Sequence, residues 1–307
     1  MKTLMITGAA GFLGRYVSQH FTEQGWSVVG IDCVDPANAP LYNLATYYKL
    51  KLPNKAIGEL LCKHTPDVCI HCAGIASVPQ SISDPVADFY ANTVVTFEVL
   101  NALRLHASPC RFILLSSAAV YGNPRSLPVH EDLPAAPISP YGFHKWQCEQ
   151  MCLEYTSIYG LPTASVRIFS AYGPGLHRQV LWDMCRKVLM QKSLTLQGTG
   201  RESRDFIHAL DVAKALGIIA GNAPMQGEVY NIASGCETTI RELAELILDA
   251  LNADCLPQFD GVVPPGTPLN WEADIVRLSS LGFVPTIPLQ QGIRTFAQWC
   301  RTELLLR

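Results

Sequence analysis

A tyrosine and a lysine four residues apart are the first candidates for chemistry in this chain. The segment SPYGFHK places Tyr141 and Lys145 just after Ser139 and Pro140. Serine is a favoured helix N-cap and proline a favoured first-turn residue, so we expect a helix to begin here. Residues four apart share one face of a helix, which puts the phenol beside the ammonium group. A free phenol titrates at about 10, and a nearby cation favours the phenolate. Such a pair can take a proton from a hydroxyl group and return it.

The same spacing occurs once more, at Tyr47 and Lys51, so the pattern alone is not decisive. The second pair lies in ATYYKLKL, which has no helix start before it and no hydroxyl-rich strand end upstream. Tyr141, by contrast, follows an apolar run over 111–117 that predicts a strand. Ligands in open α/β sheets bind at the carboxyl ends of the strands. This context favours Tyr141 and Lys145 as the catalytic pair.

Two serines, Ser116 and Ser117, end the strand expected over 111–117. Side chains alternate between the faces of a strand, so only one of these hydroxyls can face the tyrosine. A serine there would hold the reacting oxygen of a substrate by a hydrogen bond. Alternation does not choose between the two.

A glycine-rich turn lies near the start of the chain. TGAAGFLG holds Gly8, Gly11 and Gly14 between a strand expected over 3–8 and a helical pattern that continues to about residue 24. The tight turn, the close approach of a phosphate and the packing of helix on strand each require a residue without a side chain. The N-terminus of the helix then offers free N–H groups to a pyrophosphate. We interpret this segment as a dinucleotide-binding loop.

An acidic residue follows at the distance that such a loop requires. Asp32 ends a second expected strand, over 26–32, and could accept hydrogen bonds from the adenosine ribose. No Lys or Arg follows until Lys49, so a partner for a 2′-phosphate is missing and NAD is favoured over NADP. Arg15, beside the glycine loop, is a basic residue that could offset this preference.

The first half of the chain alternates short apolar runs with helical patterns. Further strands are expected over 67–74, 111–117 and 163–169. This alternation predicts a Rossmann-type, doubly wound α/β fold, in which helices cover both faces of a parallel sheet.

The pattern loosens after about residue 170, where Gly and Pro become frequent. We therefore divide the chain into an NAD-binding domain over 1–165 and a smaller C-terminal substrate-binding region over 166–307. Within the second region a helix is expected over 239–251. Part of 205–232 is expected to rejoin the main sheet, with the strand-like segment 205–211 as the candidate.

Composition excludes several classes of function. Apolar residues make up 49% of the 307 residues and charged residues only 16%, which indicates extensive burial. The net charge is −3 without a basic cluster, so nucleic acid is not expected as a partner. Eleven cysteines suggest metal or disulfides, but Cys69 and Cys72 lie in a strand pattern and would point to opposite faces. No metal site, signal peptide or membrane span is expected, and we predict a cytoplasmic protein.

Together these residues resemble the extended short-chain dehydrogenases/reductases, and within them the NAD-dependent sugar-nucleotide epimerase/dehydratase family. The resemblance covers nearly the whole chain. Its motifs follow one another in the order TGAAGFLG, HCAGIASVPQSISDP, NTVVTFEVL, SSAAVYG, SPYGFHK, RIFSAYGPG, RDFIHALDVA and YNIASG.

The resemblance implies roles for individual residues. Ser117 takes the position of the substrate-binding serine, Tyr141 that of the acid/base, and Lys145 that of the cofactor-binding lysine. The implied cofactor-binding positions are Gly8, Gly11, Phe12, Leu13, Gly14, Asp32, Leu52, Ala73, Gly74, Asn92, Tyr141, Lys145 and Phe169. The implied substrate-binding positions are Ser117, Tyr141, Ser170 and Arg204, the last of which matches an arginine that binds a nucleotide diphosphate.

The chain departs from the family pattern in places. Ser170 stands where many members have Asn, and Asn270 where many have Arg. Lys51 replaces a common Asp just before the adenine-contacting position, Leu52. The family's dehydratases usually carry an acid shortly after the serine, and this chain has only alanines there, Ala118 and Ala119. Elimination of water therefore lacks its acid.

The resemblance implies an NAD-dependent epimerase of a nucleotide-diphosphate sugar, similar to UDP-hexose 4-epimerases and acting by transient hydride transfer to tightly bound NAD. Two alternatives remain. One is an NAD(P)-dependent reductase or dehydrogenase of a 4-keto nucleotide sugar, and the other is a non-catalytic NAD-binding scaffold or redox sensor. Family members commonly dimerise through the helix that carries the tyrosine and the preceding long helix, here about 141–158 and 86–106. A homodimer with a UDP-linked substrate is therefore expected.

Overall fold

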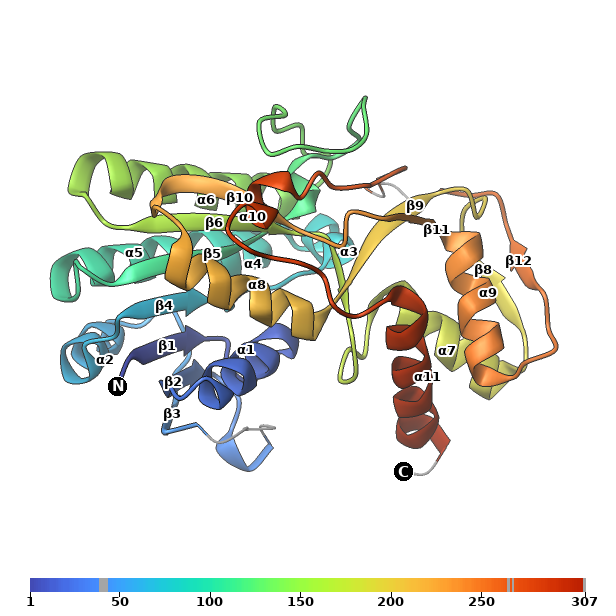
Figure 1. Ribbon diagram of the computed structural model, residues 1–307, viewed down its shortest axis with the longest axis horizontal. Coiled ribbons are helices and arrows are strands. Elements are labelled where there is room, and N and C mark those ends of the chain that lie inside the picture. Colours follow the sequence, from blue (N-terminus) through green and yellow to red (C-terminus); the bar gives the residue numbers. More distant parts are fainter. Residues whose placement is uncertain (39–43, 264–265, 267, 306–307) are drawn as a thin grey trace.

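A seven-stranded parallel sheet forms the centre of the molecule. The computed structural model describes residues 1–38, 44–263, 266 and 268–305. The strand order is β10-β6-β5-β4-β1-β2-β3 (Figure 1). Their bounds are β1 Thr3–Thr7, β2 Ser27–Asp32, β3 Thr46–Lys49, β4 Val68–His71, β5 Arg111–Ser117, β6 Thr163–Ile168 and β10 Gln226–Ile232. The predicted Rossmann-type, doubly wound fold is confirmed.

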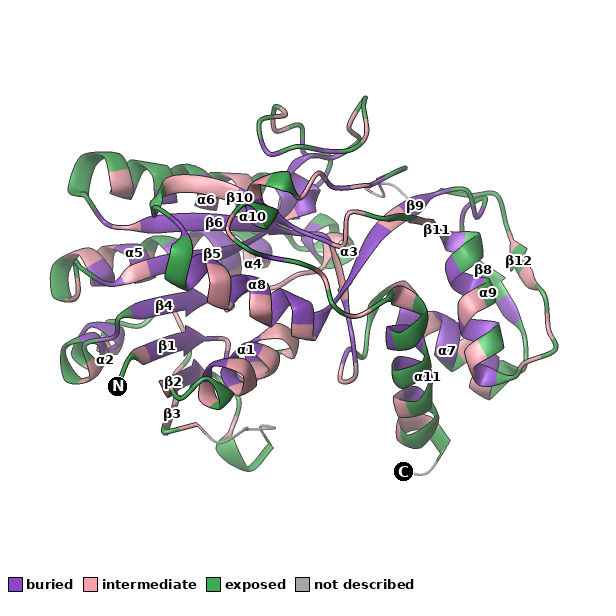
Figure 2. Ribbon diagram, viewed as in Figure 1, coloured by how far each residue is buried: buried purple, intermediate pink, exposed green. Residues whose placement is uncertain are grey.

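Helices cover both faces of this sheet. One face packs against α1 (Phe12–Glu23) and α8 (Ala209–Asn222), which lie on the viewer's side in Figure 1. The other face packs against α2 (Ala56–His64), α5 (Val95–His106) and α6 (Pro140–Tyr159). Successive strand residues enter alternate cores, so that Ile113 and Leu115 face α8 while Phe112 and Leu114 face α5 and α6. The inner strands β1, β4, β5 and β6 are buried on both sides (Figure 2), as their nearly continuous apolar sequences require, whereas the edge strand β3 is partly exposed.

Short elements lie between β4 and α5, close to the carboxyl ends of the strands. They are α3 (Val78–Ser83), α4 (Pro85–Phe89) and a π-helical turn, Tyr90–Val94, that runs directly into α5. Two 3₁₀ turns occupy Pro36–Asn38 and Ala118–Val120.

The second region holds two small sheets and its own apolar core. One sheet joins β11 (Glu237–Thr239), β9 (Ser203–His208) and β7 (Ser170–Tyr172), and the other joins β12 (Pro257–Phe259) to β8 (Leu194–Leu196). The helices α7 (Gln179–Gln191), α9 (Ile240–Leu251) and α11 (Leu289–Leu305) pack together beside them, at the right in Figure 1. The short α10 (Val276–Ser279) returns to the main sheet next to β10.

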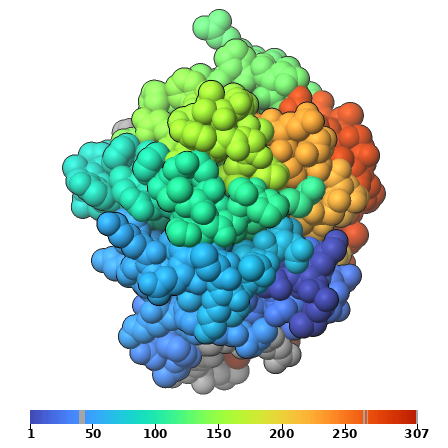
Figure 3. Space-filling view, turned by 90° about the vertical axis from the view of Figure 1, so that its left-hand side faces the viewer, coloured from blue at the N-terminus to red at the C-terminus, as the bar shows by residue number. Residues whose placement is uncertain are grey.

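The strand that returns to the main sheet lies within the expected range 205–232 but is not the expected segment. The segment 205–211 was the expected extra strand, but β9 pairs with β7 and β11 instead. The strand that does join is β10, which pairs in parallel with β6 and fills that edge of the sheet. Figure 3 shows the consequence, because the orange residues of the second half lie against the green residues of the first. The division at residue 165/166 itself stays a prediction.

A buried carboxylate links the two regions. Asp205 in β9 is fully buried and accepts hydrogen bonds from the backbone N–H groups of Ser234, Gly235 and Ala273, at 2.8 to 3.2 Å. Ser234 lies two residues after the buried end of β10, so this carboxylate joins the small sheet to the main one.

No helix within the described part of the chain is long and apolar enough to cross a membrane.

We predict that Asp205→Ala lowers the free energy of unfolding by about 3 to 5 kcal/mol, because three buried N–H groups lose their acceptor. Urea unfolding monitored by circular dichroism measures the change. Asp249→Ala, on the exposed face of α9, is the control and should change stability by less than about 0.5 kcal/mol. A loss below about 1 kcal/mol for Asp205→Ala would contradict this account of the link.

Candidate active site

The glycine loop forms a turn into which side chains do not fit. Gly8 has a φ of +73°, and a Cβ atom there would lie 2.6 Å from the backbone nitrogen of Ala73. A Cβ atom on Gly14 would lie 2.0 Å from the carbonyl oxygen of Gly8. Gly11 caps α1 without a side-chain hydrogen bond, so the first N–H groups of the helix remain available. The loop therefore has the form that a pyrophosphate needs.

Asp32 lies beside this loop. One carboxylate oxygen accepts the N–H of Ala10 at 3.0 Å and the other accepts that of Val34 at 3.2 Å. Each oxygen keeps a lone pair for a further donor, such as a ribose hydroxyl. Lys49, the first cation after it, forms an ion pair with Asp35 at 2.9 Å. The Arg15 guanidinium donates to the carbonyl of Gly175. Neither Lys49 nor Arg15 is bound to Asp32, so neither cation is in place at this carboxylate to bind the 2′-phosphate of NADP. The residues fit NAD.

Tyr141 and Lys145 lie side by side, as the helical spacing predicts. Both are buried, with 7% and 6% of their surface exposed. The Lys145 ammonium lies 6.0 Å from the centre of the Tyr141 ring and donates to the carbonyl of Leu115 at 2.9 Å. The backbone N–H of Tyr141 donates to the hydroxyl of Ser81, which anchors the start of α6 to α3. No carboxylate forms an ion pair with Lys145 among the described residues.

The structure separates the two serines that the sequence could not. The Ser116 hydroxyl points toward α6 and donates to the Glu149 carboxylate at 2.5 Å, and Arg167 binds the same carboxylate at 2.7 Å. Ser117, one residue later, has the opposite orientation and accepts only the N–H of Ala119, at 3.2 Å. Its hydroxyl keeps its hydrogen for another acceptor, which agrees with the role expected for Ser117.

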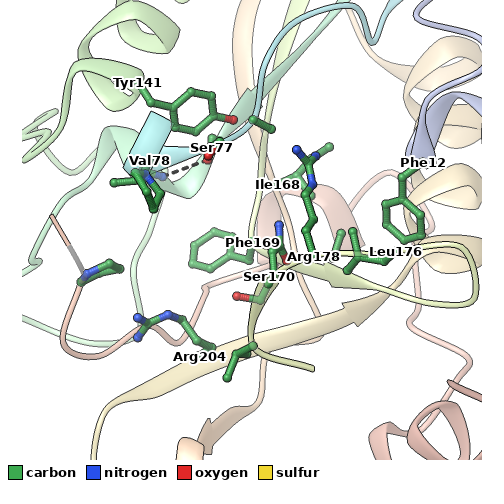
Figure 4. Close-up of a pocket in the computed structure, with 18 of the residues that line it drawn as sticks. Phe12, Ser77, Val78, Tyr141, Ile168, Phe169, Ser170, Leu176, Arg178 and Arg204 are labelled. Atoms are coloured by element: carbon green, nitrogen blue, oxygen red, sulfur yellow. Dashed lines mark hydrogen bonds between the residues drawn. The ribbon is translucent and has the colours of Figure 1, made fainter. Parts of the chain in front are cut away.

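A cavity of about 840 Å³ lies between the carboxyl ends of the central strands and the second region. Figure 4 shows Tyr141 directing its hydroxyl into this space, with Phe169, Ser170 and Arg204 around it. Predicted site residues that line the cavity are Gly8, Gly11, Phe12, Leu13, Gly14, Gly74, Ser117, Tyr141, Lys145, Phe169, Ser170 and Arg204.

Four predicted cofactor residues do not line it. Asp32 lies at the glycine loop, as described, and the side chains of Leu52 and Ala73 pack against the core between the sheet and α2, α5 and α6. Asn92 is fully buried behind Gly74. Tyr47, from the second match to the spacing, does not line the cavity. Its hydroxyl donates to the carbonyl of Val34.

Sequence reasoning missed several lining residues. Ser77 and Val78 follow the end of β4 by six and seven residues, in the segment that leads into α3, so their position after a strand was a usable signal. Arg178 and Trp271 come from the second region and had no such signal. Only the packing of the second region against the sheet brings them to the cavity.

The charges on the cavity wall favour an anionic ligand. Burial lowers the pKa of Arg204 to about 10, and the guanidinium contacts carbonyl oxygens and the Trp271 ring but no carboxylate within the described residues. Arg178 lines the cavity too, and its side chain forms no hydrogen bond or ion pair with the described residues. The nearby acids are engaged elsewhere, since Glu202 accepts the N–H groups of a turn and Asp183 forms ion pairs along α7.

A buried histidine lies beneath the lysine. His71 ends β4, and its Nδ1 atom lies 2.6 Å from the hydroxyl of Thr7. Burial and the charge of Lys145 lower the pKa of His71 to about 3, so the imidazole is neutral at physiological pH. Lys145 and Lys187 supply the ammonium groups among the described lining residues of the cavity, and Lys187 forms an ion pair with Asp183.

Comparison with known proteins gives the same family that the motifs indicate. The family model described as NAD dependent epimerase/dehydratase family matches residues 4–233. The chain is similar to a putative UDP-glucose 4-epimerase from Methanocaldococcus jannaschii, with 30% identity over 98% of this chain and 99% of that protein. A UDP-glucose 4-epimerase from Mycolicibacterium smegmatis is also 30% identical, over 99% of both chains.

A solved structure extends the likeness to three dimensions. The UDP-glucuronic acid 4-epimerase from Bacillus cereus, in complex with UDP-glucuronic acid and NAD, superposes with a TM-score of 0.89. It is 28% identical, and the match covers 98% of this chain and 99% of that one. The fold, the glycine loop and the matched family model agree, and the chain belongs to the NAD-dependent epimerase/dehydratase family.

Proposed function

We propose that this protein is an NAD-dependent epimerase of a nucleotide-diphosphate sugar, with UDP-linked hexoses as substrates, by its similarity to UDP-glucose 4-epimerases. The observation that carries the proposal is the meeting of Ser117, Tyr141 and Lys145 with the glycine loop at one cavity. A cavity of about 840 Å³ is of the size that a large polar ligand requires.

The proposed roles follow from the contacts of each side chain. Tyr141 takes the proton of the sugar 4-hydroxyl while that carbon is oxidised and returns it when the carbon is reduced. Lys145 favours the phenolate by its charge and keeps N–H groups for the ribose of the cofactor. Ser117 holds the reacting oxygen. Gly8, Gly14 and Asp32 would hold NAD, which when bound supplies a reversible hydride acceptor.

The arginines support an anionic substrate. Arg204 is a cation without a carboxylate partner in the described chain, and a guanidinium binds a diphosphate with two hydrogen bonds. The alanines that follow Ser117 support epimerisation over dehydration. Ala118 and Ala119 are buried, and neither can protonate a leaving hydroxyl.

The direct test is interconversion of UDP-glucose and UDP-galactose, or of their N-acetyl forms, by purified protein without added cofactor. Epimerisation with no net change at the nicotinamide absorbance band supports the proposal. Accumulation of NADH, or strict dependence on NADPH, would favour the reductase or dehydrogenase alternative.

We predict that Tyr141→Phe lowers kcat by about 10²- to 10⁴-fold, because the proton loses its acceptor. The NAD content after purification should stay unchanged. Tyr155→Phe makes the same chemical change in the same helix, away from the cavity, and should keep full activity. Turnover by Tyr141→Phe at the rate of the natural protein would remove the mechanism.

A uronic acid is a second candidate for the sugar, and Arg178 is the observation that favours it. In the view of Figure 4, Arg178 and Arg204 lie on opposite sides of Phe169 and Ser170. If Arg204 binds the diphosphate, Arg178 is left to bind a second acidic group, such as a sugar carboxylate. The Bacillus cereus structure contains UDP-glucuronic acid, which carries such a group.

We predict for this candidate that Arg178→Gln lowers kcat/KM for UDP-glucuronic acid roughly 10- to 100-fold more than for UDP-glucose, the value of a hydrogen bond between charged groups. Steady-state rates with both substrates measure the difference. Arg186→Gln, in the helix α7 that Arg178 precedes, is the control, because Arg186 is paired with Asp183. Equal losses on both substrates would assign Arg178 to a group that the two share.

The surface of α4, α5 and α6 supports a homodimer. Large apolar side chains are exposed there, and the exposed Phe97 of α5 packs edge-on against the buried Tyr155 of α6. The exposed residues are Val86, Phe89, Tyr90, Phe97 and Leu105 on the 86–106 segment, with Leu153, Ile158 and Tyr159 on α6. A second copy of the chain would cover this face.

We predict that the protein elutes as a dimer and that Leu153→Glu converts it to a monomer of 33.7 kDa, because a carboxylate would be buried in the interface. Light scattering after gel filtration measures the mass. Leu256→Glu introduces the same charge at an exposed position outside this face. A monomeric natural protein at micromolar concentration would contradict the proposal.

A further inference from the structure

A buried histidine–aspartate pair lies behind the candidate catalytic residues. His144 is on α6 between Tyr141 and Lys145, and its Nδ1 atom lies 2.5 Å from a carboxylate oxygen of Asp88. The side chains are 12% and 1% exposed. Phe89 packs edge-on against the imidazole at 5.3 Å. Neither residue lines the cavity.

The other Asp88 oxygen holds a buried amide. It accepts from the Nδ2 group of Asn92 at 3.2 Å, in the π-helical turn that follows α4. The same Nδ2 group donates to the carbonyls of Ile75 and Asp88, each at 3.1 Å. With its N–H groups committed in this way, the amide of Asn92 has one orientation.

That orientation places the amide against the wall of the cavity. The Asn92 Oδ1 atom is buried and has no hydrogen-bond partner among the described residues. A Cβ atom added to Gly74 would lie 2.6 Å from this oxygen and 3.6 Å from the Lys145 ammonium. Gly74 and the four residues after it all line the cavity. A chain of contacts therefore runs from His144 through Asp88 and Asn92 to the cavity wall.

Stability alone is a poor reason for this arrangement. Asp88 forms no ion pair with a lysine or arginine in the described chain, and a buried carboxylate has a large desolvation cost. Apolar side chains of similar volume would pack between α4 and α6 at no such cost. What the polar pair adds is direction, because a hydrogen bond fixes an angle and a distance that apolar contact leaves free.

We propose that Asp88 and His144 are positioning residues. They hold Asn92, and through it the backbone of residues 74–78, at a fixed distance from the helix that carries Tyr141 and Lys145. This inference rests on the proposed function, since residues 74–78 and Lys145 are the parts of the cavity wall that would face the NAD. A displacement of about 1 Å between reacting groups lowers a rate by roughly 100-fold.

The first experiment compares two substitutions of the carboxylate. Asp88→Ala removes both hydrogen bonds and should speed the release of NAD, followed by its fluorescence or absorbance, about 10-fold or more. It should also lower kcat roughly 10- to 100-fold and leave KM for the sugar nucleotide within about threefold. Asp88→Asn keeps an acceptor for Asn92 and should recover most of the NAD retention.

The control is a second buried carboxylate. Asp211 in α8 is equally buried and accepts the N–H groups of Thr286 and Ile287, away from the cavity. Asp211→Ala should lower the Tm at least as much as Asp88→Ala but keep NAD release and kcat unchanged. If Asp88→Ala lowers only the Tm, like this control, the pair is structural and the inference is wrong.

The second experiment changes the histidine. It tests the proposal even if Asp88→Ala does not fold. His144→Asn places its amide nitrogen near the position of Nδ1 and should retain NAD and activity. His144→Gln places its amide nearer the position of Nε2 and should behave like Asp88→Ala. Equal behaviour of the two variants would overturn the proposal.

The outcomes also separate this inference from the proposed function. A natural protein that binds NAD but epimerises no sugar nucleotide would refute the proposed function alone, because NAD release still reports on Asp88 and His144. A natural protein that binds no NAD would refute both.

Discussion

One hydrogen bond joins the two elements on which the candidate site depends. The buried ammonium of Lys145 donates to the carbonyl of Leu115, near the carboxyl end of the central strand β5. A buried cation needs an acceptor, and this strand end supplies one. The bond sets the position of α6 along β5, and with it the distance between Tyr141 and the serine at the end of the strand. The rest of the cavity is built around that contact.

The chain divides its chemistry between two kinds of structure. Parallel strands bring the glycine loop, Gly74 and Ser117 to a common edge, because all their carboxyl ends meet there. The second region brings Arg178 and Arg204 to the same cavity on its own small sheet and helix. The first set supplies the groups common to the family. The second contains the departures from the family pattern, Ser170 and Asn270, and is the part of the molecule where a different sugar or nucleotide would be recognised.

Buried carboxylates in this protein orient the groups around them as well as contributing to stability. Glu149 fixes the Ser116 hydroxyl and binds Arg167, which leaves the next residue, Ser117, on the cavity side. Asp205 joins the small sheet to the end of β10 through backbone N–H groups. Asp88 accepts a hydrogen bond from the amide of Asn92 and contacts His144 of α6. Each carboxylate contacts a residue far away in the sequence. Each therefore fixes the relative position of two parts of the fold more closely than apolar packing alone would.

The amino-acid sequence by itself determined the parallel α/β fold, the dinucleotide loop, and the pairing of Tyr141 with Lys145. These features depend on local chemistry, namely strand and helix periodicity, glycine in a tight turn, and helical spacing. Tertiary structure alone decided that β10 and not the 205–211 segment joins the main sheet, because both are short strands that mix polar and apolar residues and local sequence does not name their partners. It also decided which serine hydroxyl is bound by Glu149 of α6, and it brought Arg178 to the cavity and placed Asp88 and His144 behind its wall. Such contacts join residues far apart in the chain, and no local pattern encodes them.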